Sequence, residues 1–440
     1  MTNSYTLTND QKKGADAFFE FLMNEDKYFC LSGGAGVGKT FLMGHISDQV
    51  MQTYEDACKL LDIPQQYNDV IFTATTNKAA EVLEKSLGKP VQTIHSFLAL
   101  KVRENRKTGK TELESTSNTV AVYNKIVFID ESSMINTVLT GWIEKCFKDC
   151  KVIFVGDHAQ MAPVGEDISP IYNLVSEENF VFLAEPVRNA DSPPLMALCE
   201  QLRNTVETGE FHPMAEVPGH IEYLNGPQMQ AKLEETFAEP DGSARILCYT
   251  NARVQNFNAF IREVEGKEDS ICEGDVMVVA SAYAQGNMSL SVEREVVITK
   301  VKPEIHSAGY GYLCDDGEDI KFRNIEITTS LSGDTGISVA VVTEPERLRH
   351  VLQKLARKKQ FSEYFDLKAS FLDLRDKHAC TVYKSQGSTY ETVFIDIGNI
   401  GVSHDPKQVA RMLFVGVSRA RSKIYFFGKL PTKYIGRRVA

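Results

Sequence analysis

Residues 31–40 read LSGGAGVGKT and follow the apolar residues 28–30. The glycines of this stretch let the backbone take positive φ angles, so successive N–H groups can point inward and form a nest for an anion. The helix expected after the turn adds the positive end of its dipole. Lys39 can reach the β- and γ-phosphates of a nucleotide, and the hydroxyl of Thr40 can hold Mg²⁺. The stretch therefore predicts a phosphate-binding loop between a buried strand and a helix.

The rest of the chain supports an α/β fold class around this loop. Short apolar runs at 28–32, 70–74, 126–130 and 152–156 alternate with helix-like segments. This alternation predicts parallel strands joined by crossover helices. The pattern returns from about residue 245 and again at 392–398 and 423–428, so we expect a second α/β unit.

Two stretches interrupt the alternation and predict insertions. Residues 101–123 are polar and carry turn chemistry at 107–110, which predicts a hairpin. Between 272 and 342, the runs 274–281, 294–301, 309–317 and 337–344 are β-type and predict a small inserted barrel. Residues 344–377 are basic and read as helical.

Composition limits the compartment and the mode of binding. The 440 residues suggest more than one domain, and the net charge of −11 argues against a strongly basic nucleic-acid binder, although local patches can still bind phosphate. No stretch is apolar enough to span a bilayer, and residues 1–10 lack the pattern of a secretory signal. The nine scattered cysteines fit a reducing compartment, so we expect a cytoplasmic protein.

Acidic and amide side chains follow two of the predicted strands. The run KIVFIDESSM at 125–134 ends a buried strand in Asp130 and Glu131. Asp130 can belong to a metal shell, and Glu131 can orient or deprotonate an attacking water. A simple strand cap is the alternative for this pair, and a polar loop is the alternative for Gln160 after the next strand. Next to a phosphate loop, the catalytic interpretation is favoured.

Phosphoryl transfer also needs cations for the charge that develops on the phosphate. Arg188 and Arg419 are the candidates, and each alone is also compatible with a surface ion pair. Because both lie far along the chain from the loop, they suggest a second domain that closes over the nucleotide. Residues 384–387 would lie on the same edge between domains.

Nine segments now form an ordered set: LTNDQ, GGAGVGKT, TATTNKAA, TIHSF, FIDESSM, GDHAQMAPVG, PVRN, TVYKSQGSTYETVFID and LFVGVSRAR. Together they resemble superfamily 1 DNA helicases, and most of all their RecD-like and bacteriophage Dda-type branch. The DESSM form favours this branch over the UvrD/Rep type, whose acidic motif usually reads DExQD. The resemblance spans about residues 5–427 and is weakest over 98–123 and 272–375.

The resemblance implies roles for individual residues. Adenine would be recognised by Gln11. The ATP phosphates would be held by the loop residues Gly33, Gly34, Ala35, Gly36, Val37, Gly38, Lys39 and Thr40. Mg²⁺ would be held by Thr40 and Asp130, with Glu131 as the catalytic base. The γ-phosphate would be contacted or sensed by Gln160, Arg188, Gln386 and Arg419. Single-stranded DNA would be contacted by Thr76, Asn77, Thr93, His95 and Lys384. For His95, a buried hydrogen-bonded histidine is the alternative.

The resemblance also implies a domain plan of two RecA-like P-loop domains in tandem. Domain 1A would comprise 1–97 and 124–190, and domain 2A would comprise 191–271 and 378–440. Residues 98–123 would form a pin, domain 1B, that splits the duplex. Residues 272–377 would form domain 2B, an SH3-like barrel with a helical arm over 344–377 that braces against the pin. The turn at 107–110 offers no aromatic wedge, and the ring before it is Phe97 at the base.

The function we expect is that of an ATP-dependent DNA helicase that moves 5′-to-3′ on single-stranded DNA. The main alternative is an ATP-driven translocase or clamp of a recombination complex that does not unwind. A GTPase is disfavoured because residues 77–80 lack the Asp of a guanine-reading motif, and a small-molecule kinase would not need two distant arginines. Expected partners are single-stranded and forked DNA, with a single-strand-binding protein or other replication and recombination proteins as candidates. We expect a monomer, in the host cytoplasm if a bacteriophage encodes it.

Overall fold

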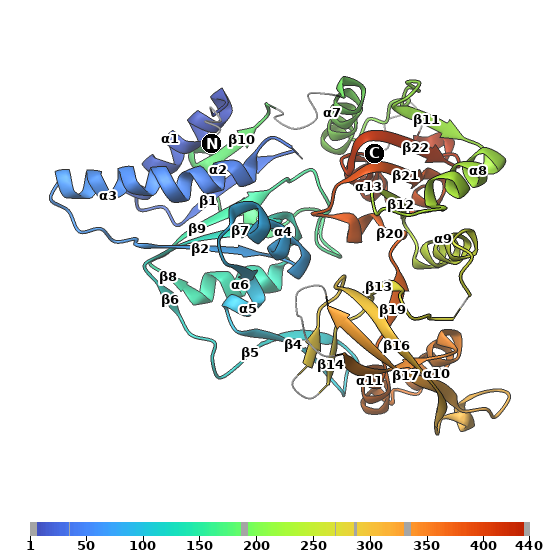
Figure 1. Cartoon of the computed structure of the whole chain (residues 1–440). Helices are drawn as coiled ribbons and strands as arrows, with labels where there is room; N and C mark the ends of the chain where they lie inside the picture. Colours follow the sequence, from blue (N-terminus) through green and yellow to red (C-terminus); the bar gives the residue numbers. More distant parts are fainter. Residues whose placement is uncertain are drawn as a thin grey trace.

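The computed structural model describes residues 7–34, 36–185, 192–268, 270–285, 288–329 and 336–434. Figure 1 shows three parts around a common centre: one parallel sheet with its helices, a second parallel sheet with its helices, and a smaller antiparallel unit below the second. We call the two parallel-sheet parts lobe 1 and lobe 2, and the smaller part the antiparallel unit. The α/β fold with parallel sheets that the sequence predicts is confirmed.

Lobe 1 is built on a six-stranded parallel sheet in the order β10-β1-β9-β7-β2-β3. Its strands are β1 (Tyr28–Gly33), β2 (Asp69–Ala74), β3 (Val91–Thr93), β7 (Lys125–Asp130), β9 (Lys151–Gly156) and β10 (Phe180–Leu183). Its helices are α1 (Asn9–Met23), α2 (Lys39–His45), α3 (Met51–Leu60), α4 (Asn77–Leu87), α5 (Ile94–Phe97) and α6 (Thr137–Cys146). The short strands β6 (Val122–Tyr123) and β8 (Phe147–Lys148) pair beside it.

The continuous apolar runs of lobe 1 arise because its sheet is buried on both faces. Along β7, Ile126 and Phe128 pack into one core cluster, while Val127 and Ile129 pack into another. Helices on both faces leave no polar side for a strand to expose, so its sequence does not alternate.

Lobe 2 contains a five-stranded parallel sheet in the order β11-β22-β21-β12-β20. Its strands are β11 (Ile221–Leu224), β12 (Ala244–Cys248), β20 (Ala379–Thr381), β21 (Tyr390–Asp396) and β22 (Ala420–Phe427). Its helices are α7 (Pro193–Thr208), α8 (Gly226–Phe237), α9 (Asn251–Val264), α12 (Ile397–Ile400) and α13 (Pro406–Val417). Strands from both ends of lobe 2's sequence share one sheet, so the antiparallel unit is an insertion between α9 and β20.

The antiparallel unit contains a five-stranded sheet in the order β18-β17-β16-β13-β19. Its strands are β13 (Val276–Val279), β16 (Glu295–Ala308), β17 (Ile320–Thr329), β18 (Ile337–Val342) and β19 (Leu374–Asp376), with β14 (Tyr283–Gln285) and β15 (Met288–Leu290) as a separate pair. Its helices are α10 (Pro345–Arg357) and α11 (Phe361–Ser370).

Two predictions for the antiparallel unit are wrong. Residues 309–317, expected as β-type, form a turn in which Asp319 Oδ1 accepts a bond from Gly311 N at 2.7 Å. A Cβ at position 311 would clash with Gly317 O, so this close approach requires glycine. The strand lies instead at β17, where polar residues between the apolar ones hid it. The helical prediction over 344–377 fails at its end, because β19 pairs with β13.

A two-stranded hairpin, β4 (Leu100–Glu104) and β5 (Thr111–Ser115), extends from lobe 1 toward α11, as Figure 1 shows. Arg106 Nη2 lies 2.6 Å from Asp366 Oδ1, and Arg106 Nη1 donates to Ser362 Oγ at 3.1 Å. At the tip, Gly109 has a φ of +71°, and a Cβ there would lie 2.7 Å from ring carbons of Phe361. The hairpin and the antiparallel unit are thus in contact at the tip.

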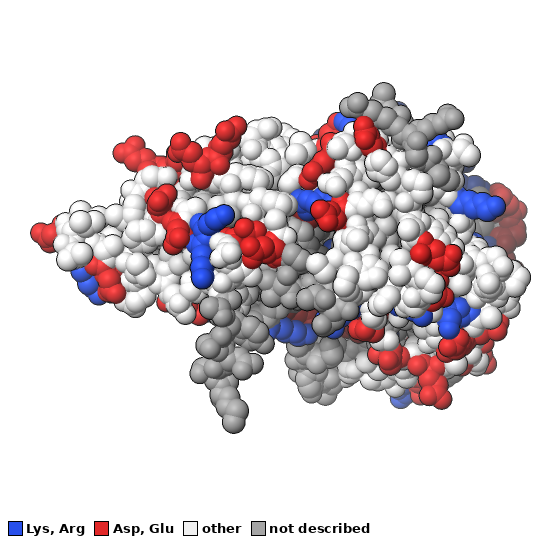
Figure 2. Space-filling model, turned by 90° about the horizontal axis from the view of Figure 1, so that it is seen from above, with Lys and Arg blue, Asp and Glu red and all other residues white. Residues whose placement is uncertain are grey.

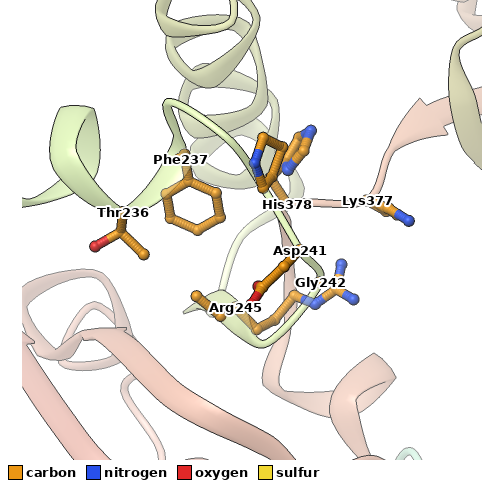
Figure 3. Close-up of a pocket in the computed structure, with 9 residues that line it drawn as sticks. Thr236, Phe237, Asp241, Gly242, Arg245, Lys377 and His378 are labelled. Carbon is orange, nitrogen blue, oxygen red and sulfur yellow. The ribbon is translucent and has the colours of Figure 1, made fainter.

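Buried charges join the antiparallel unit to lobe 2. Arg262, at the end of α9, pairs with Asp275 at 3.0 Å and Asp376 at 2.8 Å, and these three side chains are largely buried. Next to them, His378 Nε2 lies 3.2 Å from Glu265 Oε1. His378 also lines a cavity of about 10 Å³, which Figure 3 shows beside Phe237 and Arg245. This volume suits about one water molecule, so the cavity is a packing feature of the joint.

All nine cysteines are free thiols. In the described ranges, no helix combines the length and the apolar character that crossing a membrane requires.

Candidate nucleotide and nucleic-acid site

The phosphate loop leaves β1 at the edge of the sheet where the strand ends. A Cβ at Gly33 would lie 2.8 Å from Leu183 O, and Gly36 and Gly38 have φ angles of 81° and 80°. These positions therefore need glycine, for space at the first and for backbone conformation at the other two. Ala35 lies outside the described residues. The loop has the strand–turn–helix setting that the sequence predicts.

Lys39 begins α2 and is held by the loop itself. Its Nζ donates to Gly33 O at 2.7 Å and to Gly34 O at 2.8 Å, and Thr40 follows it in the first turn of the helix. Burial lowers the pKa of Lys39, while the carboxylates of Asp157, Asp130 and Glu131 act to raise it. The ammonium group thus lies among acidic residues at the carboxyl ends of neighbouring strands.

Gln11 connects α1 to the phosphate loop. It is buried, and its Nε2 donates to Val37 O at 3.2 Å. Its Oε1 accepts from Thr8 N at 3.1 Å in a capping box that begins the helix. The residue predicted to recognise adenine therefore lies against the loop, and one Nε2 proton is not used by the bond to Val37.

The predicted acidic pair lies at the end of β7. Glu131 has a φ of 52°, which turns the chain sharply after Asp130. Burial raises the pKa of Asp130 to about 7, and the nearby charge of Glu131 adds to this rise while Lys39 opposes it. A half-buried carboxyl beside a second carboxylate is chemically suited to a cation, and Mg²⁺ prefers such oxygen donors.

Several buried polar atoms around the two lobes have no hydrogen-bond partner among the described residues. They are Gln160 Oε1, Ser132 Oγ and Ser133 Oγ in lobe 1, and Gln386 Nε2 and Ser388 Oγ in lobe 2. Buried polar atoms are paired in most proteins, and an unpaired one requires an explanation. All five belong to the motifs that the sequence singled out. The three serines were missed, although each adjoins or lies close to a predicted residue.

Arg419 is buried in lobe 2 and acts across the interface. It donates to Ser418 Oγ at 2.8 Å, and to Val415 O and Ser388 O at 3.2 Å. Burial lowers its pKa, and the carboxylate of Glu131 in lobe 1 is the main opposing charge. The charge of Arg419 also acts to lower the pKa of Lys39. Arg188 lies outside the described residues.

The lobes also meet directly. A Cβ built on Gly387 would lie 3.7 Å from Glu131 Oε1, so the segment with Gln386 borders the acidic pair. Arg411 of α13 donates to His158 O at 2.7 Å, to Asp167 O at 3.1 Å and to Gln160 O. No local pattern distinguished Arg411 in the sequence, because it is one charged residue on a mostly apolar helix.

The predicted DNA-contacting residues of lobe 1 lie at the starts of two helices. Thr76 Oγ1 accepts from Ala79 N at 3.2 Å to cap α4, and Thr93 Oγ1 accepts from Ser96 N at 3.1 Å to cap α5. His95 in α5 is half-buried, and burial lowers its pKa. The hydroxyls of Thr76 and Thr93 accept hydrogen bonds in these caps, so each can still donate its own proton to another group.

A cavity of about 290 Å³ lies between lobe 1 and the antiparallel unit. Asn77, Thr93 and Ser96 line one side, and residues 291–294 line the other. Lys384 lies close by, because its Nζ is 2.7 Å from Glu293 Oε1. Asn77 and Thr93 therefore line this cavity, and Lys384 contacts Glu293 in its wall. Thr76 and His95 belong to the adjacent helix starts.

The described residues on the face that Figure 2 shows do not form a broad basic patch. In the view of Figure 2, lysine and arginine side chains are scattered among acidic clusters. Of the described basic residues in the helical arm, Arg347 and Lys354 pair with Asp316 and Asp315.

Two family models match the chain. The model described as an AAA domain matches residues 6–222, which include the phosphate loop and Glu131. The model described as a UvrD-like helicase C-terminal domain matches residues 377–427, which include Lys384 and Arg419. The two matches correspond to the two ends of the chain that meet at the interface.

Proteins that match over nearly the whole chain were also found, both among sequences and among solved structures. The ATP-dependent DNA helicase dda of Enterobacteria phage T4 is 22% identical over 96% of this chain and 99% of its own length. An uncharacterised protein, R530, of Acanthamoeba polyphaga mimivirus is 22% identical over 94% of this chain and 98% of its own. A Pif1 helicase from Bacteroides, solved with ADP-AlF3 and single-stranded DNA, is 14% identical with a TM-score of 0.53, over 98% of this chain and 95% of that one. The last likeness concerns the fold.

Proposed function

We propose that this chain is a superfamily 1 helicase of the Dda-like kind, an ATP-driven motor that moves 5′-to-3′ on single-stranded DNA and unwinds duplexes. The observation that carries the proposal is the meeting of the lobes at the phosphate loop. Arg419 and Gly387 of lobe 2 lie in electrostatic or direct reach of Glu131 and Lys39 of lobe 1. A nucleotide bound by the loop would therefore be shared between two separately folded units.

ATP would be held by residues 33–40, with the adenine against Gln11. Thr40 and Asp130 would hold Mg²⁺, whose role when bound is to neutralise phosphate charge as a Lewis acid. The donor chemistry supports this assignment, since a hydroxyl and a carboxylate suit a hard cation, and the raised pKa of Asp130 indicates a charge that lacks compensation.

Hydrolysis would use residues from both lobes. Glu131 would take a proton from the attacking water, whose oxygen forms a bond to the γ-phosphorus. At the same time the bond between the γ-phosphorus and the oxygen that bridges the β- and γ-phosphates would break. Gln160 and Gln386, each with an unpaired buried amide atom, would contact the water or the γ-phosphate, and Arg188 and Arg419 would stabilise its developing charge. Loss of the γ-phosphate then removes a contact shared by the lobes, so they can separate and take a step.

Single-stranded DNA would run through the cavity between lobe 1 and the antiparallel unit. Thr76, Asn77, Thr93 and His95 would contact it from lobe 1, and Lys384 would contact it from lobe 2. Backbone contacts of this kind predict binding that is nearly independent of sequence and weakened by salt.

We assign lobe 1 to residues 1–97 and 124–190 and lobe 2 to residues 191–271 and 378–440. The hairpin within 98–123 would be the pin that separates strands, and 272–377 would be an SH3-like barrel with a helical arm. The Arg106–Asp366 pair and the packing of Phe361 on Gly109 support a brace between arm and pin. This packing also brings an aromatic ring to a pin tip that lacks one. A monomer in the cytoplasm, with a single-strand-binding protein or other replication and recombination proteins as partners, completes the proposal.

The test compares two forked duplexes, one with a 5′ loading tail and one with a 3′ tail. We expect ATP-dependent strand separation on the first only, and none with Lys39→Ala, which removes the phosphate-binding ammonium. A folded Lys39→Ala protein that still hydrolyses ATP would contradict the site. ATPase activity stimulated by single-stranded DNA without strand separation on either fork would instead support the translocase or clamp.

A further inference from the structure

A buried ion pair crosses the interface between the lobes. Arg203 comes from α7 of lobe 2, and Asp157 directly follows β9 of lobe 1. Arg203 Nη1 donates to Asp157 Oδ2 at 3.0 Å, and Nη2 lies 2.9 Å from Oδ1. The Asp157 side chain is fully buried, and that of Arg203 is 13% exposed. Removing opposite charges from water carries a desolvation penalty, so such a pair is weak evidence for stability and calls for another role.

The guanidinium of Arg203 lies next to the phosphate loop. A Cβ built on Gly34 would be 3.8 Å from Arg203 Nη1. The rings of Phe182 in lobe 1 and Phe414 in lobe 2 lie 4.7 and 5.8 Å from the guanidinium carbon and hold it at the interface. Arg203 Nε also lies 3.3 Å from Glu207 Oε1 in the same helix. The guanidinium is therefore held by carboxylates on both sides, with Nη1 nearest to the loop.

Asp157 interacts electrostatically with one cation from each lobe, Lys39 from lobe 1 and Arg203 from lobe 2. Its carboxylate pairs with Arg203, and it is the strongest of the charges that raise the pKa of Lys39. A terminal phosphate carries more charge and more acceptor oxygens than a carboxylate, and guanidinium groups bind phosphate in a bidentate manner. A triphosphate in the loop would therefore compete with Asp157 for the same two cations.

We propose that Arg203 senses the terminal phosphate of the nucleotide, passing from Asp157 to the γ-phosphate when a triphosphate binds. It would act in addition to Arg188 and Arg419, and it would make closure of the lobes depend on whether ATP or ADP is present. The inference rests on the proposed function, because it requires the loop to bind ATP.

The test measures the dissociation constants of ADP and of a non-hydrolysable ATP analogue, and takes their ratio for each variant. For wild type we expect tighter binding of the analogue. Arg203→Ala and Arg203→Lys should lower this preference about tenfold, the factor for one charge-assisted hydrogen bond, and should leave ADP binding within about twofold. Asp157→Asn should keep or raise the preference, because it removes the competing carboxylate.

The control is Lys407→Ala, which removes an exposed pair between the lobes, with Asp167 at 2.5 Å, and should leave the preference unchanged. A purely structural bridge would make Asp157→Asn and Arg203→Ala change binding in the same direction, with ADP and the analogue weakened equally. That result would overturn the inference, as would a preference retained in both Arg203 variants. If wild type binds neither nucleotide, the proposed function itself fails.

Discussion

Replacing Glu293 with Gln should tighten the binding of single-stranded DNA. The carboxylate of Glu293 lies 2.7 Å from the ammonium of Lys384, with side chains 16% and 27% exposed. Glu293 is thus paired with Lys384, the cation that we assign to a DNA phosphate. It also lies in the wall of the cavity proposed for the strand. A strand that enters the cavity must displace this carboxylate or bind beside it.

The magnitude follows from the geometry of the pair. A hydrogen bond to a charged group contributes about 1.5–3 kcal/mol, and a phosphate recovers this only after the carboxylate leaves. The lower end of this range corresponds to about tenfold in affinity, and removing a negative charge near the phosphates acts in the same direction. Glutamine has nearly the same shape as glutamate, so the substitution should leave the backbone conformation unchanged at residue 293, where φ is 64°.

The assay is fluorescence anisotropy with a labelled oligonucleotide at fixed salt. We expect the dissociation constant of Glu293→Gln to fall about tenfold, and the effect to vanish when Lys384 is already Met. The matched control is Glu295→Gln, two residues along, whose partner Lys377 lies 3.9 Å away. Equal or weaker binding of Glu293→Gln would refute the reasoning, because Glu293 would then position Lys384 rather than compete for it.

Three further predictions concern the pin and the joint. Gly109→Ala, which forces a Cβ against Phe361, should slow strand separation several-fold while ATPase stimulated by single-stranded DNA stays within about twofold; a parallel loss of both would contradict the pin. Arg262→Met should lower the free energy of unfolding in urea by about 3–5 kcal/mol, since it leaves buried carboxylates unpaired, and a change below about 1 kcal/mol would contradict this. Burial lowers the pKa of His378 to about 4, so between pH 6.5 and 4 the unfolded chain binds a proton that the folded chain does not. The free energy of unfolding should therefore fall as the pH is lowered, and this histidine should account for a loss of about 2 kcal/mol at pH 5. The melting temperature of His378→Gln should depend less steeply on pH than that of the wild type. Identical pH slopes for the two proteins would contradict the assignment.

The sequence was sufficient for features that depend on neighbours along the chain. Glycine spacing around Lys39 predicts a loop that the structure contains, and unbroken apolar runs predict strands buried on both faces. The position of Asp130 followed as well, because parallel strands end at the same sheet edge, and β9 lies between β1 and β7 in the same sheet. Where charged residues interrupt an apolar pattern, as in β17, the local signal failed.

The sequence by itself therefore determined the two α/β lobes and the residues that each could bring to a nucleotide. Only the tertiary structure decided which charges meet: Arg203 with Asp157, 46 residues apart, Lys384 with Glu293, 91 apart, and Arg106 with Asp366, 260 apart. The physical reason is that the spacing of apolar residues and the residue types of turns depend on residues that are close together in the sequence. The partner of a polar side chain is instead set by how whole units pack, and no local pattern encodes it.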